Sequence, residues 1–315
     1  QAALQLGAAG RRCLELGLEV GLLLDLAVSV SRGGAETWAG QRLYAQGASV
    51  GAPPDDFSLR GQDWGLPPLN PLALTEAAYA PFIATLRENM RDAGALRIDH
   101  VMGLARLFWV PPGGTPAEGA YVYYPFADLL GILALESQRN RCLVVGEDLG
   151  TVPDEVRAAL QSHGVLSYRL LYFEKDADGA FKAPADYPAQ ALVAVTTHDL
   201  PTLAGFWQGT DLDLRSQLGL FPSDQQREAQ IVARSQDRAR LLVALEREGL
   251  LPAGVGVHPV SLSEMPPEVV QAVHAYLARS PAKLMLVQPE DVFGQVGQAN
   301  LPGTTDAHPN WRRRL

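Results

Sequence analysis

The chain of 315 residues has ordinary globular composition, with 47% hydrophobic and 19% charged residues, which excludes disordered, collagen-like and coiled-coil proteins. Its net charge of −9, with no basic stripe before the terminal arginines, argues against a nucleic-acid partner. No apolar run is long enough to cross a bilayer and no export signal begins the chain, so we expect a soluble, cytoplasmic protein without a membrane partner.

Short runs of Val, Ile and Leu alternate with helix-periodic stretches along the chain, a pattern typical of β/α units around a parallel sheet. About six strands are predicted, near residues 20–28, 95–101, 142–149, 167–173, 191–199 and 283–290. The composition and this alternation therefore predict an α/β fold.

The segments between these strands carry helix signals. An apolar stripe over residues 77–90 predicts one helix, and Thr151 before Pro153 marks the start of another. Ser223 and Gln226 fit a capping box at the start of a third.

Three connections, over residues 47–71, 111–124 and 209–267, are too long for simple loops. Long connections in compact domains are usually functional or form inserted subdomains, and the last one carries helices of its own.

Three predicted strands end in acidic residues: Asp99, Glu147 and Asp199. In a parallel β/α barrel the carboxyl ends of the strands meet on one face, so acids far apart in sequence can gather there. Alternate residues of a strand share a face, so Arg97 and Asp99 should point the same way. A neighbouring guanidinium keeps a carboxylate ionised, as a nucleophile requires.

Glu147 follows Leu143 and Val145 on one face of the next strand, above an apolar layer. Loss of water there, together with repulsion from nearby carboxylates, should raise the pKa of its carboxyl group and suit it to general acid catalysis. One ionised and one protonated carboxyl group are what retaining glycoside cleavage requires. Asp199 could then bind sugar hydroxyls and stabilise positive charge. A single acid at a strand end is about as often solvated or a helix cap, but three together favour a site.

Three segments carry a family resemblance: residues 95–101 (ALRIDHV), 145–152 (VGEDLGTV) and 196–202 (TTHDLPT). They resemble motifs of 4-alpha-glucanotransferases, also called amylomaltases or disproportionating enzymes, which form glycoside hydrolase family 77 of the α-amylase clan. The loop over residues 51–67 is similar to the one that separates this family from ordinary α-amylases. The resemblance extends from residue 25 to residues 300–304 (NLPGT) and 309–312 (PNWR), and so covers nearly the whole chain.

The resemblance implies that Asp99 is the nucleophile, Glu147 the acid/base and Asp199 the stabiliser of the transition state. It further implies that seven residues bind substrate or orient the acids: Asp25, Gln62, Trp64, Arg97, His100, His198 and Asn300. Each has a simpler explanation. Trp64 could pin its loop to the body, the two histidines could be core residues, and Asn300 could cap a turn.

The resemblance also implies a (β/α)8 barrel of the TIM type with helical insertions, in which residues 1–315 form one partial catalytic barrel. In the family the acid that Asp25 matches closes the third strand, so we expect the first two strands to be missing from this chain. The aromatic residues Trp38, Trp109, Trp207, Tyr121, Tyr123 and Tyr124 could in principle stack on sugar rings, but most aromatic residues are core residues and none of these is assigned to the site.

We therefore predict a retaining transferase that moves α-1,4-glucan segments between a donor and an acceptor, such as maltooligosaccharides and glucose. The alternatives are an α-amylase-like hydrolase and an inactive glucan-binding fragment. No cofactor and no metal is predicted, because neither the two cysteines nor the six histidines form a metal-binding cluster. The oligomeric state is left open.

Overall fold

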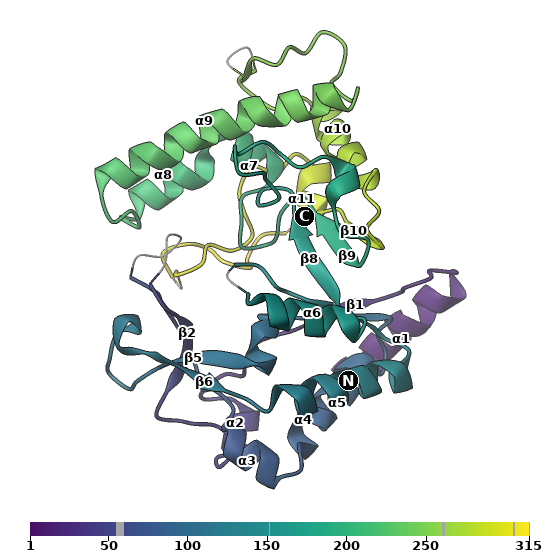
Figure 1. Cartoon of the computed structure of the whole chain (residues 1–315), viewed down its shortest axis with the longest axis vertical. Helices are drawn as coiled ribbons and strands as arrows, with labels where there is room; N and C mark the ends of the chain where they lie inside the picture. The colour runs from purple at the N-terminus through teal and green to yellow at the C-terminus, as the bar shows by residue number, and fades with distance from the viewer. Residues whose placement is uncertain (55–59, 151, 260–261, 305, 315) are drawn as a thin grey trace. The chain divides into compact units, whose positions relative to one another are not determined.

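The computed structural model of the chain describes residues 1–54, 60–150, 152–259, 262–304 and 306–314 (Figure 1). It divides into two compact units, Gln1–Ser167 and Tyr168–Leu315, which are called the first and second unit below. The predicted helix start at Thr151 and the loop residues 55–59 lie outside the described residues.

Parallel strands form the centre of the first unit. The strand β4 (Ala95–Ile98) lies between β1 (Leu23–Leu26) and β7 (Leu143–Gly146), and every residue of β4 is buried. Pairing aligns Asp25 with Arg97 and Arg97 with Val145. Because these strands are parallel and in register, the residues that follow them leave the sheet at one edge.

The first unit also contains an antiparallel sheet that the sequence did not predict. Its strand order is β3-β2-β5-β6, with β2 (Ser49–Ala52), β3 (Gln62–Leu66), β5 (Arg106–Val110) and β6 (Ala120–Tyr123). Two of the three long connections, residues 47–71 and 111–124, supply β2, β3 and β6, so they form an inserted sheet. Gly51 is required where β2 meets β3, since a Cβ there would lie 2.0 Å from the carbonyl oxygen of Gln62.

Helices surround these strands. The predicted helix over 77–90 is present but begins later, as α4 (Ala80–Met90), because Ala78 and Tyr79 adopt left-handed backbone conformations with φ of 47° and 59°. The helix after the second motif begins at Asp154 and follows Pro153. The other helices are α1 (Ala2–Glu15), α2 (Ala35–Ala39), α3 (Pro71–Glu76), α5 (Phe126–Asn140) and α6 (Asp154–Ser162), with 3-10 turns η1 (Val101–Leu104) and η2 (Pro116–Glu118).

The core of the first unit lies between these helices and the strands. It includes Leu86 and Met90 of α4, Leu96 of β4, and Leu130 and Leu133 of α5. The apolar residues whose spacing predicted α4 form the face of the helix that packs into this core.

The second unit contains the parallel strands β8 (Leu166–Leu170, from Tyr168 onward), β9 (Ala191–Ala194) and β10 (Leu284–Leu286), in that order. The predicted helices between residues 209 and 267 are confirmed as α8 (Thr210–Gln217) and α9 (Asp224–Arg247), which lie alongside one another in Figure 1. The remaining elements are η3 (Pro184–Asp186), α7 (Leu203–Gln208), α10 (Pro267–Ala278) and α11 (Pro289–Val292).

Ser223 caps α9, and its Oγ accepts a hydrogen bond from the Gln226 N–H at 3.3 Å. The reciprocal bond of the predicted capping box is not formed, since Oε1 of Gln226 has no partner among the described residues. A separate core in the second unit is built from residues of α7, α9 and α10, including Trp207, Leu242 and Tyr276.

The α/β fold is confirmed, and each of the six predicted parallel strands is present. The predicted strands extended too far: the segment 191–199 is a strand only over Ala191–Ala194. Among the described residues, no helix has both the length and the apolar character to span a membrane.

Candidate active site

Arg97 is the centre of an acidic cluster at the carboxyl ends of β1, β4 and β7. Its Nη1 lies 2.6 Å from Asp25 Oδ1 and its Nη2 lies 2.8 Å from Asp99 Oδ1. Arg97 is buried; burial alone would lower the pKa of its guanidinium, but the charges of Asp99 and Asp25 outweigh it and raise the pKa. Arg97 and Asp99 thus share a face, as strand alternation predicted.

Glu147 follows β7 and is held by main-chain donors. Its Oε2 accepts a hydrogen bond from the His100 N–H at 2.9 Å, and its Oε1 accepts one from the Leu149 N–H at 2.8 Å. Burial raises the pKa of its carboxyl group, and the charge of Asp99 adds to the increase; the two N–H donors and Arg97 oppose it. The pKa of Glu147 is thus raised, in the direction predicted from the sequence.

His100 links this acid to an aromatic residue of the antiparallel sheet. The His100 backbone is left-handed, with φ of 45°, and its ring meets the Trp64 ring edge-on with centroids 5.3 Å apart. The Trp64 indole N–H donates to Gln62 Oε1 at 3.0 Å. Burial lowers the pKa of the His100 imidazole, although the charge of Asp99 opposes this. Trp64 also packs against the first core, so it anchors its loop as well as contacting His100.

The second unit brings together the other three predicted site residues. Asn300 donates from Nδ2 to Asp199 Oδ1 at 2.6 Å, and its main-chain N–H donates to the His198 carbonyl at 3.1 Å. The His198 Nε2 lies 3.4 Å from Asp199 Oδ2. Asp199 is in a loop five residues beyond β9 rather than at the strand end. Asn300 therefore orients the Asp199 carboxylate. The simpler explanation of Asn300 as a turn cap did not predict this contact.

Sequence reasoning did not select Trp311, although it lies in the motif at residues 309–312. Its ring centroid is 4.9 Å from that of His198. A tryptophan inside a motif that carries the family resemblance was the signal that could have found it, whereas the aromatic residues named as possible platforms included Trp207 and Tyr124. Both of these are buried, which removes them as sugar platforms.

Asp148, next to Glu147 in sequence, has a different environment. It is buried and accepts hydrogen bonds from Arg157 of α6 and from the Ser167 hydroxyl, the latter at 2.7 Å. These contacts make it a structural carboxylate. No group of three or more His, Cys, Asp or Glu side chains within the described part of the chain is arranged to hold a metal ion.

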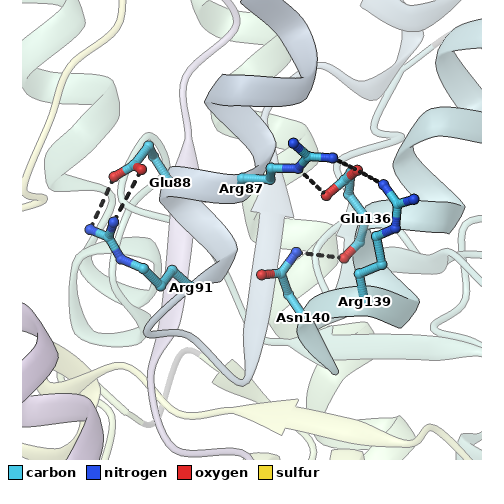
Figure 2. A pocket seen from close by; sticks show the side chains of 6 residues that line it. All are labelled: Arg87, Glu88, Arg91, Glu136, Arg139 and Asn140. Carbon is cyan, nitrogen blue, oxygen red and sulfur yellow. Dashed lines mark hydrogen bonds and ion pairs between the residues drawn. The ribbon is translucent and has the colours of Figure 1, made fainter. Parts of the chain in front are cut away.

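A hollow on the outer helices of the first unit contains none of the predicted site residues. Figure 2 shows Glu136 of α5 between Arg87 of α4 and Arg139, with the Glu88–Arg91 pair beside them. Arg87 donates to both oxygens of Glu136, at 2.8 and 2.9 Å, and Arg139 donates to Oε1 at 2.8 Å. The Arg87–Glu136 pair joins α4 to α5, and the two arginines together engage both oxygens of the Glu136 carboxylate.

The family model described as 4-alpha-glucanotransferase matches residues 1–315. The chain belongs to the 4-alpha-glucanotransferase family. The resemblance inferred from the motifs is thereby confirmed.

Relatives in this family align with almost the whole chain. A 4-alpha-glucanotransferase of Haemophilus influenzae is 45% identical over 311 residues, which are 99% of this chain and 44% of that protein. One of Mycobacterium bovis is 44% identical over 98% of this chain and 42% of its own length. The crystal structure of amylomaltase from Corynebacterium glutamicum superposes with a TM-score of 0.90 at 37% identity, covering 98% of this chain and 44% of that one. The chain thus spans less than half the length of these 4-alpha-glucanotransferases.

Proposed function

We propose that the protein containing this chain is a retaining 4-alpha-glucanotransferase that moves α-1,4-glucan segments from a donor to an acceptor glucan. The observation that carries the proposal is that two acids of the first unit, Asp99 and Glu147, have different surroundings. Asp99 is paired with Arg97, whereas burial raises the pKa of Glu147. Family membership supports the same assignment.

In the proposed reaction, Asp99 attacks the anomeric carbon of the donor while Glu147 protonates the departing glycosidic oxygen. The covalent glucosyl–enzyme ester releases the first product. Glu147, now a carboxylate, takes the proton of the 4-hydroxyl of an acceptor glucan, and that oxygen displaces Asp99. Two displacements retain the anomeric configuration.

The remaining site residues receive supporting roles in this proposal. Asp199, oriented by Asn300 and His198, would stabilise positive charge on the sugar ring. Asp25, Arg97 and His100 would bind the sugar at the cleavage point. Gln62 and Trp64 would favour an acceptor sugar over water. The six parallel strands would be part of a (β/α)8 barrel of the TIM type, to which residues 1–315 contribute one catalytic region.

Incubation of the whole protein with maltotriose tests the proposal. Transfer yields a ladder of longer maltooligosaccharides together with glucose, measured by chromatography over time. Release of maltose and glucose without elongation would indicate an α-amylase-like hydrolase. Binding of maltotriose without any bond cleavage would indicate a glucan-binding protein, and either result would refute transferase activity.

A further inference from the structure

Trp311 is an exposed indole held in an unfavourable backbone conformation. Its side chain is 64% exposed, and its φ of 59° lies in the left-handed region that bulky residues rarely adopt. Residues of this kind are concentrated at ligand-binding sites, where the surrounding structure holds them in place. The ring is therefore not placed by burial in a core.

Polar contacts fix the segment that carries the indole. The Trp311 N–H donates to the Ala299 carbonyl at 3.0 Å. Oδ1 of Asn310 accepts from the Leu301 N–H at 2.9 Å, and Nδ2 of Asn310 donates to the Thr304 carbonyl at 3.0 Å. Arg313 donates to the Gly297 carbonyl. These bonds tie residues 310–313 to residues 297–304 and hold the indole at a set position.

That position is next to polar groups suited to sugar hydroxyls. The Trp311 ring lies 4.9 Å from the His198 ring at an interplanar angle of 52°. His198 approaches Asp199, which also accepts from Asn300. A carbohydrate ring presents an apolar face bordered by hydroxyl groups, and an aromatic ring beside donors and acceptors matches both features.

We propose that Trp311 binds a pyranose ring of the glucan through its exposed face and positions the imidazole of His198 through its other contact. This inference rests on the proposed function, since it takes the ligand to be an α-1,4-glucan. Trp38 is also an exposed indole, with 79% of its surface exposed, but it lies within the helix α2. It therefore serves as a matched control for the loss of an exposed indole.

The experiment compares Trp311→Ala, Trp311→Phe and Trp38→Ala in the whole protein. KM and kcat are measured with maltotriose, and the Tm is measured for each variant. We expect Trp311→Ala to raise KM by about 3- to 10-fold, because a stacking contact is lost, with a smaller fall in kcat. Trp311→Phe retains a ring and should raise KM by less than about 3-fold. Trp38→Ala should leave KM and kcat unchanged.

A second measurement uses the pseudo-tetrasaccharide acarbose as a probe of binding by tryptophan fluorescence. We expect the change on adding acarbose to be smaller in Trp311→Phe than in the parent and unaltered in Trp38→Phe. An unchanged KM in Trp311→Ala with only a lower Tm would overturn the proposal, as would an undiminished fluorescence change in Trp311→Phe. If the parent does not elongate maltotriose, the transferase assignment fails, while the acarbose measurement still decides the role of Trp311.

Discussion

Two arginine–carboxylate clusters of the first unit have opposite charge balances. At the strand ends, the single guanidinium of Arg97 is shared by Asp25 and Asp99, whose side chains remain 45% and 36% exposed. On the outer helices, the single carboxylate of Glu136 is 2% exposed and is shared by Arg87 and Arg139. The first cluster retains excess negative charge next to solvent, and the second has none.

The pKa directions follow this difference. Burial raises the pKa of Glu147 beside the first cluster, whereas the hydrogen bond from Arg87, supported by Arg139, lowers the pKa of Glu136 in the second. A carboxyl group whose pKa is raised is suited to exchange a proton during a reaction, while a carboxylate held ionised by two arginines is suited to a structural ion pair. Burial alone thus does not set the direction of a pKa shift, because hydrogen bonds from neighbouring arginines can reverse it, as they do at Glu136.

The largest effect is expected from Asp99→Asn. The amide cannot form the covalent ester, so kcat with maltotriose should fall by at least about 10³-fold. Glu88→Gln, which removes an exposed ion pair near the outer cluster, should leave kcat unchanged. Turnover of Asp99→Asn within tenfold of the parent would remove Asp99 from the nucleophile role.

Glu147→Gln should lower kcat by about 10²- to 10⁴-fold because no proton reaches the leaving oxygen. In the parent, kcat/KM should decline as pH rises through the raised pKa of Glu147, since the acid form is lost; the residual activity of the variant should lack this decline. A pH series of kcat/KM measures both. An unchanged alkaline decline in the variant would assign that titration to another group.

The stability of Glu147→Gln should change much less than its activity. The folded state holds the Glu147 proton more tightly than the unfolded state, so ionisation costs stability as pH rises from the ordinary glutamate pKa through the raised one. Glutamine removes this cost but leaves one N–H donor without an acceptor. We expect the Tm at neutral pH to stay within about 3 °C of the parent value.

Arg97→Lys tests whether one cation must reach two carboxylates. A lysine ammonium is a compact point charge and cannot reproduce the forked contacts to Asp25 and Asp99. We expect kcat/KM to fall by about 10- to 100-fold with the fold retained, as followed by circular dichroism. Activity within twofold of the parent would show that the shared guanidinium is dispensable.

The smallest effect on activity is expected from Glu136→Gln, with kcat/KM within twofold of the parent. Its effect should be on stability, with the Tm lowered by about 2–5 °C at neutral pH. Because the folded pKa of Glu136 is lowered, its contribution is present above the ordinary glutamate pKa and is lost as pH falls through the lowered one. The Tm difference between parent and variant should therefore shrink in acid; a constant difference would contradict the role of the charge.

The sequence was sufficient for features that depend on local patterns. The strands β7, β9 and β10 each carry a run of apolar residues, and alternation continued from β4 correctly placed Arg97 beside Asp99. The direction of the Glu147 pKa shift was predicted correctly, although of the two residues expected to form an apolar layer beneath it only Val145 is buried and Leu143 is exposed.

The antiparallel sheet could not be read in the same way. Its strands are four or five residues long and β2 contains a register shift between Val50 and Gly51, so no period of two persists. The contact of Asn300 with Asp199 joins residues 101 positions apart, and that of Trp311 with His198 is also distant in sequence. Neither leaves a local pattern, so only the folded chain reveals them.

The main-chain N–H groups of His100 and Leu149 donate to the two carboxyl oxygens of Glu147, so the main chain sets the orientation of this carboxyl group. Replacing neighbouring side chains, including the imidazole of His100, keeps both main-chain N–H donors. A proline at position 100 would remove one of these two hydrogen bonds, because proline has no N–H. Side chains around Glu147 can therefore be redesigned without changing the two main-chain donors that orient its carboxyl group.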